Sequence, residues 1–214
     1  YFSDASTRIM PREMDGSVEE HYGPWFTGVK PYEALRINGE IATDPRYALR
    51  VFVQDMTNPQ EGYLSYDEGA SFQKAFDSDG EEFYSYEFAR TDPNRVYISG
   101  TWNMWRSDDG GESFVQCGAQ PLPQLDGNMH FTKLTVDPNN EDHVIYICHD
   151  QPGLVSETFD GGESWMPFDL GTLANKRIHQ ILLVGDEYNS CYVTTYDGAS
   201  VYFKDNTMQD FIDY

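Results

Sequence analysis

Three aspartates of this 214-residue chain stand where carboxylate chemistry could operate: Asp55, Asp150 and Asp197. Each follows a strand-like run of apolar residues, so each is expected in a loop at a strand end. Hydrolysis of a glycosidic bond needs two carboxyl groups, about 5–5.5 Å apart for retention of configuration or about 6.5–9.5 Å for inversion, with one kept protonated. These three aspartates are therefore the candidate catalytic residues, and an ordinary solvated turn is the alternative for each.

Aromatic and polar residues occupy the neighbouring loop positions. A pyranose ring offers an apolar face for stacking and hydroxyl groups that bond to Asp, Asn and His side chains. The candidate ligand-binding residues are Trp102, Asn103, His149 and Tyr196. Aromatic rings and carboxylates on one surface thus suit a sugar.

The sequence motifs support no other chemistry. The sequence contains no nucleophile elbow, no His-Glu-x-x-His pair, no phosphate-binding glycine loop and no dinucleotide fingerprint. The histidines are scattered, and Cys117, Cys148 and Cys191 lack metal-ligand spacing. We therefore expect no metal and no cofactor. Cys148 and Cys191 are expected as buried thiols, with a bridge between them as the alternative.

A repeat shows which elements would position these residues. The segments SYDEGASF at 65–72, SDDGGESF at 107–114 and TFDGGESW at 158–165 share the pattern Ser/Thr-x-Asp-x-Gly-x-x-aromatic. Their spacing of roughly 40 to 50 residues is that of a four-stranded propeller blade. A fourth, eroded copy runs from Lys204 to Phe211, with Asn206 at the position of the Asp.

The pattern predicts a locked turn between two strands. The Asp carboxylate can accept hydrogen bonds from nearby backbone N–H groups, and the Gly can take a positive φ that a Cβ would oppose. The aromatic residue then begins the next strand and packs between sheets. We expect a structural role, rather than catalysis or metal binding, for Asp67, Gly69, Asp109, Gly111, Asp160 and Gly162.

The three segments resemble the Asp-box, or BNR, repeat of sialidases, xyloglucanases and sortilin-type receptors. With the flanking strands, the resemblance covers most of the chain. It implies a β-propeller whose boxes lie mostly on the face opposite the ligand. The Arg-Ile-Pro motif of sialidases is matched only loosely by Arg8-Ile9-Met10-Pro11. Xyloglucanase-like and sortilin-like propellers are therefore the better match.

Strand runs and Asp-Pro turns around each box complete the blades. First strands are expected at Glu33–Ile37, Phe83–Phe88, His130–Val136 and Ile178–Val184. Second strands are expected at Leu49–Val53, Val96–Ser99, Val144–Cys148 and Cys191–Thr194. The predicted fold class is all-β, a β-propeller of four-stranded antiparallel blades. Residues 1–214 form one propeller domain or propeller fragment, with whole blades at 32–76, 77–120, 121–170 and 171–214.

Residues 1–31 supply only part of a blade in this interpretation. Tyr1-Phe2-Ser3 matches a second strand, and no first strand precedes it. We therefore expect a piece of a larger propeller, or an open edge paired by another chain or a missing segment. A closed five-bladed ring is the alternative.

The formal net charge of −22 opposes binding to phosphate backbones and anionic membranes, so no nucleic acid partner is expected. No apolar run reaches transmembrane length, so no membrane insertion is expected either. The composition suits a secreted protein, extracellular or periplasmic. The favoured function is glycan recognition, with glycoside hydrolysis of the xyloglucanase type as an extension. The alternative is a sortilin-like or scaffold propeller that binds an extracellular protein without chemistry.

Overall fold

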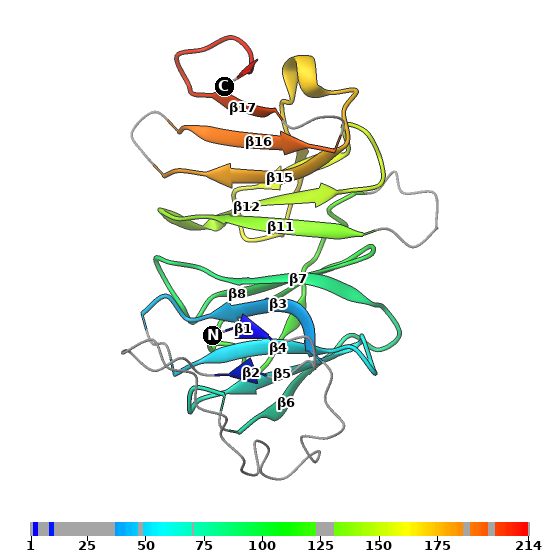
Figure 1. Cartoon of the computed structure of the whole chain (residues 1–214), viewed down its shortest axis with the longest axis vertical. Coiled ribbons are helices and arrows are strands. Elements are labelled where there is room, and N and C mark those ends of the chain that lie inside the picture. The colour runs from blue at the N-terminus through cyan, green and yellow to red at the C-terminus, as the bar shows by residue number, and fades with distance from the viewer. Residues whose placement is uncertain are drawn as a thin grey trace.

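The structure is a computed structural model that describes residues 2–3, 9–10, 37–46, 49–69, 71–122, 131–185, 189–196 and 200–213. Over these residues the chain is built of β-strands apart from one 3-10 turn, Gly171–Leu173. Four sheets of four antiparallel strands follow one another along the chain (Figure 1). The predicted fold class, an all-β propeller of four-stranded blades, is thereby confirmed.

Each blade is a meander in which neighbours in sequence pair with each other. The first blade contains β3 (Ile37–Thr43), β4 (Val51–Asp55), β5 (Glu61–Ser65) and β6 (Gln73–Asp77). The second contains β7 (Phe83–Phe88), β8 (Val96–Gly100), β9 (Met104–Ser107) and β10 (Val115–Gln116). The third contains β11 (Thr132–Asp137), β12 (Asn140–Cys148), β13 (Val155–Thr158) and β14 (Met166–Pro167). The fourth contains β15 (Ile178–Leu183), β16 (Cys191–Thr195), β17 (Val201–Lys204) and β18 (Ile212–Asp213).

The blades follow one another along the long axis, with the first and the fourth blade at opposite ends (Figure 1), and we call this row of blades the arc. The first strand of each blade is innermost, since β7 contacts both β3 and β11, and β11 contacts β15. The arc has two faces. We call the face with the turns after β5, β9, β13 and β17 the box face, and the face with the loops after β4, β8, β12 and β16 the loop face.

The first strand expected at Glu33–Ile37 extends further along the chain than predicted. Strand β3 begins at Ile37 and continues to Thr43, and residues 33–36 lie outside the described part. A register shift between Ile37 and Ile41 interrupts the pairing with β4, which resumes with Ile41 opposite Val53. The bulge lets the strand run on to the Asp44-Pro45 turn, where Pro ends the ladder.

At the amino end, β1 (Phe2–Ser3) and β2 (Ile9–Met10) form a two-stranded antiparallel pair, and β1 contacts β3. The rest of the expected partial blade lies outside the described residues. Its assignment as a second strand stays a prediction.

The repeated turns have the same hydrogen bonds in each of three blades. In the second blade, Asp109 Oδ1 accepts N–H groups from Glu112 at 3.0 Å and Ser113 at 2.9 Å. The Ser107 hydroxyl donates to the same carboxylate at 2.7 Å and accepts the N–H of Gly111 at 2.8 Å. Gly111 has a φ of +94°. The Asp and the preceding Ser therefore tie the turn to the end of β9.

Equivalent bonds recur in the other two boxes. Asp67 accepts the N–H of Ser71 at 2.7 Å, and Asp160 accepts that of Ser164 at 2.9 Å. The eroded fourth turn differs, because Asp205, rather than Asn206, accepts the N–H of Thr207 at 2.8 Å.

Among the described residues, three core clusters join successive blades, and a fourth, Val51, Val53, Tyr63 and Phe72, belongs to the first blade alone. Phe52 and Leu64 of the first blade pack with Phe83, Ile98 and Trp105 of the second. Of the box aromatics expected between blades, Phe72 is buried, whereas Phe114 and Trp165 are partly buried against the core. All three cysteines are buried thiols that form no disulfide.

Candidate functional site

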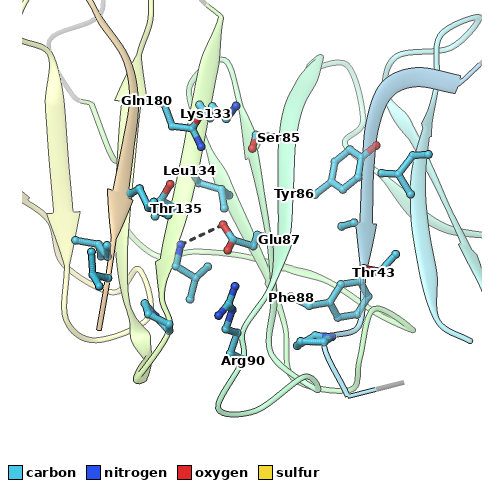
Figure 2. A pocket seen from close by; sticks show the side chains of 18 residues that line it. Thr43, Ser85, Tyr86, Glu87, Phe88, Arg90, Lys133, Leu134, Thr135 and Gln180 are labelled. Carbon is cyan, nitrogen blue, oxygen red and sulfur yellow. Dashed lines mark hydrogen bonds between the residues drawn. The ribbon is translucent and has the colours of Figure 1, made fainter. Parts of the chain in front are cut away.

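The innermost strands of all four blades line a groove with a volume of about 820 Å³ (Figure 2). Glu87 and Arg90 project into the space between β7 and β11, whereas Lys133 and Gln180 lie at the other end of the view. The groove therefore has charges of both signs, together with amide and hydroxyl groups. Its volume lies within the usual range of ligand sites, about 300–1,000 Å³.

Hydrogen bonds between blades fix the walls of this groove. Glu87 Oε2 accepts the backbone N–H of Val136 at 3.2 Å, which ties β7 to β11. The Thr135 hydroxyl donates to the carbonyl of Ile181 at 2.8 Å, which ties β11 to β15. The spacing between groove residues is thus set by the sheets rather than by loops.

A second arrangement lies on the loop face of the third and fourth blades. The Tyr196 hydroxyl is 3.2 Å from His149 Nδ1, and the ring of Tyr196 meets His149 and His179 edge to face at 5.6 and 5.0 Å between centroids. The guanidinium of Arg177 lies 5.4 Å from the Tyr196 ring centroid. Tyr196 is 47% exposed, so one flank of this cluster meets solvent.

The protonation of His149 is controlled by its surroundings. Burial, together with the positive charges of Lys133 and His179, lowers the pKa of His149 to about 4. The imidazole is therefore neutral at pH 7. It can exchange a hydrogen bond with Tyr196 without placing a charge in the cluster.

Further residues of the loop face connect this cluster with the second blade. Asp150 Oδ2 accepts the N–H of Phe131 at 3.2 Å, and the Phe131 carbonyl accepts the N–H of His149 at 2.9 Å. The ring of Phe131 packs edge to face on Tyr84 at 5.1 Å and is 60% exposed. We call Tyr84, Phe131, His149, Asp150, His179 and Tyr196 the loop-face surface.

Trp102 and Asn103 lie at the loop-face end of the second blade, where a buried carboxylate positions them. Glu81 accepts both the Trp102 and the Asn103 backbone N–H groups, the latter at 3.0 Å, and the Asn103 side-chain amide at 2.6 Å. Asn103 Oδ1 also accepts a bond from Gln116 at 2.9 Å. The amide of Asn103 is therefore engaged within the protein, whereas Trp102 remains partly exposed.

Asp55 occupies a different environment from the one expected of a catalytic carboxylate. Its exposed fraction is 0%, and Oδ1 accepts the Thr57 N–H at 2.9 Å and the Thr57 hydroxyl at 2.7 Å. It caps the turn after β4. Asp197 lies outside the described residues, so Asp150 is the exposed member of the candidate set that the structure describes.

The structure thus brings together His149, Asp150 and Tyr196, and it places Trp102 and Asn103 on a neighbouring blade. Five residues on this face were not predicted from the sequence: Glu81, Tyr84, Phe131, Arg177 and His179. One signal was available, since Tyr84 and His179 are both second residues of first strands, at the register shifts of β7 and β15. Aligning the first strands as well as the boxes would have paired them.

Within the described ranges, no group of three His, Cys, Asp or Glu side chains could hold a metal ion. The same part of the chain has no helix long and apolar enough to cross a membrane.

The fold and the repeated turns define the class, an Asp-box β-propeller. The family model Sortilin-Vps10, described as "Sortilin, neurotensin receptor 3", matches residues 60–209. The chain belongs to this family, which confirms the resemblance carried by the boxes. No curated protein matches the sequence.

Solved structures show the same fold at low identity. The GH74 xyloglucanase from Xanthomonas campestris is 16% identical with a TM-score of 0.67, and the match covers 89% of this chain and 32% of the enzyme. An ancestral GH74 enzyme is 14% identical with a TM-score of 0.60, covering 83% of this chain and 26% of the enzyme. YCF48 bound to D1 peptide is 15% identical with a TM-score of 0.54, covering 84% of this chain and 54% of that chain. The chain therefore spans about a quarter to a third of these GH74 enzymes.

Proposed function

We propose that this chain is a binding propeller without hydrolytic chemistry, and that its inner groove holds an extended segment of a partner polypeptide. The observation that carries the proposal is the groove itself, which is concave and is lined by all four blades with charged residues of both signs. The description of the family names neurotensin receptor 3, and one structural neighbour was solved with a bound peptide. We place this activity outside the cytoplasm, in line with the acidic composition.

A polypeptide segment fits the chemistry of the groove walls. A peptide offers backbone donors and acceptors to Thr43 and Gln180, and its charged side chains can pair with Glu87, Arg90 or Lys133. The net charge of −22 opposes a strongly anionic ligand, so we expect a peptide of low net charge whose carboxylates pair with Arg90 and Lys133.

The test is a screen of a random dodecapeptide library against the immobilised protein, followed by calorimetric titration of the selected peptide. Arg90→Ala and Lys133→Ala should each weaken binding about 5-fold or more, because each removes a charge-assisted contact. Lys74→Ala and Lys204→Ala are the matched controls, since they change the net charge equally but pair with Glu61 and Asp77 and with Asp169, and neither residue lines the groove. Equal losses in all four variants would contradict the groove as the site.

Glycan recognition on the loop-face surface is the second candidate function. It is favoured by the exposure of Phe131 and Tyr196 beside the carboxylate of Asp150. On a glycan array, binding to a neutral β-linked oligosaccharide should fall at least about 10-fold in Tyr196→Ala or Phe131→Ala, because a stacking surface is lost. Trp102→Ala extends the test to the second blade. Saccharide binding that survives all three substitutions would exclude this surface.

Hydrolysis would require a second carboxyl group facing Asp150. Asp55 is buried in its turn, so we assign it no catalytic role. The decisive assay measures release of oligosaccharides from xyloglucan by the purified protein. Turnover that disappears in Asp150→Asn or in Asp197→Asn would overturn the proposal of a purely binding protein.

A further inference from the structure

A second cavity lies on the box face between the third and the fourth blade. Its volume is about 450 Å³, within the usual range of ligand sites. The polar and aromatic residues that define its chemistry are Asp137, His143, Glu157 and Phe159 of the third blade and Lys204 and Asp205 of the fourth. Glu87, Arg90 and Lys133 line the inner groove instead, so the charged groups of the two sites are separate. We call this second space the box-face cavity.

The corresponding space between the first and the second blade is filled by Arg50, the residue before β4. Its guanidinium lies 3.4 Å from the carboxylate of Asp44 in its own blade and donates to the carbonyl of Pro93 in the second at 3.2 Å. The same group lies 6.0 Å from the ring centroid of Tyr66. A Cβ added at Gly110 would collide with it, so the guanidinium rests against the box turn of the second blade.

Arg95, the residue before β8, occupies the same place between the second and the third blade. Its guanidinium pairs with Asp108 of its own blade at 2.6 Å and with Asp142 of the third. A Cβ added at Gly161, in the box turn of the third blade, would lie 3.1 Å from Arg95 Nη1. Both interfaces therefore place a guanidinium, carried by the residue before the second strand, against the box turn of the next blade.

His143 stands at the position of those two arginines in the third blade, since each of the three precedes the first fully buried valine of its second strand. Both of its ring nitrogens are engaged within its own blade, by Asp137 at 2.8 Å and by Glu157 at 3.3 Å. Its ring stacks on Phe159 at 4.3 Å between centroids. Phe159 corresponds to Tyr66, because each follows the Ser or Thr of its box. The imidazole is shorter than an arginine side chain, and the box-face cavity lies between it and the turn of the fourth blade.

The carboxylates beside His143 are largely buried. The side chains of Asp137 and Glu157 are 15% and 17% exposed. A neutral imidazole has one N–H to donate, so it can satisfy one of these carboxylates but not both. Lys204, the basic residue that the fourth blade contributes to the cavity, pairs with Asp169 at 3.1 Å. Because a largely buried carboxylate without a positive partner is costly, the cavity favours a further cation.

We propose that the box-face cavity binds the guanidinium group of a ligand, in the place that Arg50 and Arg95 occupy at the other two interfaces. The guanidinium pairs with the carboxylate of Glu157 and lies beside the ring of Phe159, as Arg50 lies beside the aromatic ring of its own blade. Phe159 is 53% exposed, so its ring is accessible to a ligand. A guanidinium is favoured over an ammonium, because its planar fork matches a carboxylate and because both filled interfaces use arginine. The group belongs either to a free guanidinium compound or to an arginine side chain of a polypeptide.

The test is calorimetric titration of the protein with two probes, agmatine and the peptide Gly-Gly-Arg-Gly-Gly. The same peptide with citrulline in place of arginine is the uncharged control, because citrulline keeps the shape of the side chain. The arginine peptide should bind at least about 10-fold more tightly than the citrulline peptide. Tighter binding of agmatine than of the arginine peptide assigns the cavity to a free compound, and the reverse order assigns it to a protein side chain. Equal binding of the arginine and citrulline peptides, with no binding of agmatine, would overturn the proposal.

Three variants locate the site of probe binding. Glu157→Gln removes a carboxylate from the cavity and should weaken both probes at least about 10-fold. Glu163→Gln is the matched control, because it removes the same charge from the same blade but faces Arg106 of the second blade at 3.6 Å and does not line the cavity. His143→Arg supplies the guanidinium of the other two interfaces from within the chain and should abolish binding. If His143→Arg does not fold, the comparison of Glu157→Gln with Glu163→Gln decides.

An NMR titration of His143 gives a second readout. Agmatine should lower the pKa of His143, because the ligand and the protonated imidazole compete for the same carboxylates, Asp137 and Glu157. The other ionisable groups that line the cavity are Asp169, Cys191, Lys204 and Asp205. A pKa of His143 that agmatine leaves unchanged would overturn the proposal, and so would equal losses of binding in Glu157→Gln and Glu163→Gln.

Glu87→Gln separates this site from the proposed peptide site, since Glu87 lines the inner groove and not the box-face cavity. Agmatine should bind this variant as it binds the natural chain. Loss of agmatine binding in Glu87→Gln but not in Glu157→Gln would place the probe in the groove and overturn the proposal. Failure of the groove to bind peptides leaves the agmatine result unaffected, so the two proposals fail separately.

Discussion

The box face and the loop face are made by the ends of the same strands, yet they differ in kind. On the box face, Asp67, Asp109 and Asp160 repeat one set of hydrogen bonds to their own turns. On the loop face, the second-to-third strand loops differ from blade to blade: Asp55 caps its own turn in the first blade, whereas His149 contacts the Tyr196 hydroxyl in the third. Repetition therefore indicates where stability is maintained, and divergence indicates where a ligand can be recognised.

The largest effect is expected on the box face, at Gly162. Its φ of +98° is unfavourable for any Cβ, and an added Cβ would lie 2.6 Å from Met104 Cε and 2.8 Å from Cys117 Sγ. Gly162→Ala should therefore lower the free energy of unfolding by about 2–4 kcal/mol. Gly111→Ala is the control, since its φ is similar but its nearest contact, Leu64 Cδ2, is at an ordinary 3.4 Å. Urea unfolding that ranks Gly111→Ala as equally damaging would mean that φ alone decides.

The second-largest effect on stability is expected on the loop face, at the buried carboxylate of Glu81. Glu81 is 6% exposed and accepts bonds from the backbone and side chain of Asn103. Glu81→Ala leaves these donors without an acceptor and should cost about 2–3 kcal/mol. Because the change also releases Trp102, ligand binding on this face should weaken beyond the loss of stability. Urea unfolding and calorimetry on the same preparation separate the two effects, and unaltered binding would show that Trp102 needs no such positioning.

The third prediction compares the stability contributed by one carboxylate of the box face, Asp109, with that contributed by one of the loop face, Asp150. Asp109→Ala removes the acceptor for two backbone N–H groups and should cost about 1–2 kcal/mol, whereas Asp150→Ala should cost less than about 1 kcal/mol. Burial alone would raise the pKa of Asp109, but hydrogen bonds from Ser113 and Ser107 hold it at about 2. Its stabilisation is therefore complete above the unfolded pKa of about 4 and is lost as the pH falls toward 2. Acid unfolding should be shallower in Asp109→Ala, and an unchanged acid limb would contradict this.

The box face could be predicted from sequence because its interactions are local. Asp109 bonds to residues three and four positions away, so the pattern of residue types contains the whole turn. The loop-face surface could not be predicted in the same way. Tyr196 meets His149 and Tyr84 meets Phe131 across long stretches of chain, and the type of one residue does not specify the other. Asp55 was misleading because a carboxylate after a strand caps a turn as readily as it faces a ligand.

The smallest predicted effect is a difference in pKa between two histidines, one on each face. His143, on the box face, lies between Asp137 at 2.8 Å and Glu157 at 3.3 Å. Burial alone would lower its pKa, but the hydrogen bonds to Glu157 and Asp137 raise it above the ordinary value. His149 has a pKa lowered to about 4, so the two should separate clearly in an NMR titration.

The two shifts act on stability with opposite signs. For His143, the folded pKa exceeds the unfolded value of about 6.5, so its stabilisation is present below pH 6.5 and is lost as the pH rises through the folded pKa. For His149, the unfolded chain binds a proton between about pH 6.5 and 4 while the folded chain does not, so stability falls as the pH drops through that window. His143→Gln should therefore lower stability at pH 5.5 more than at pH 8, whereas His149→Gln should reduce the loss of stability between pH 6.5 and 4. Equal titration midpoints for His143 and His149 would contradict the proposed effects of the box-face carboxylates and of burial on the loop face on the two pKa values. The distinction between the two faces would then rest on hydrogen bonds alone.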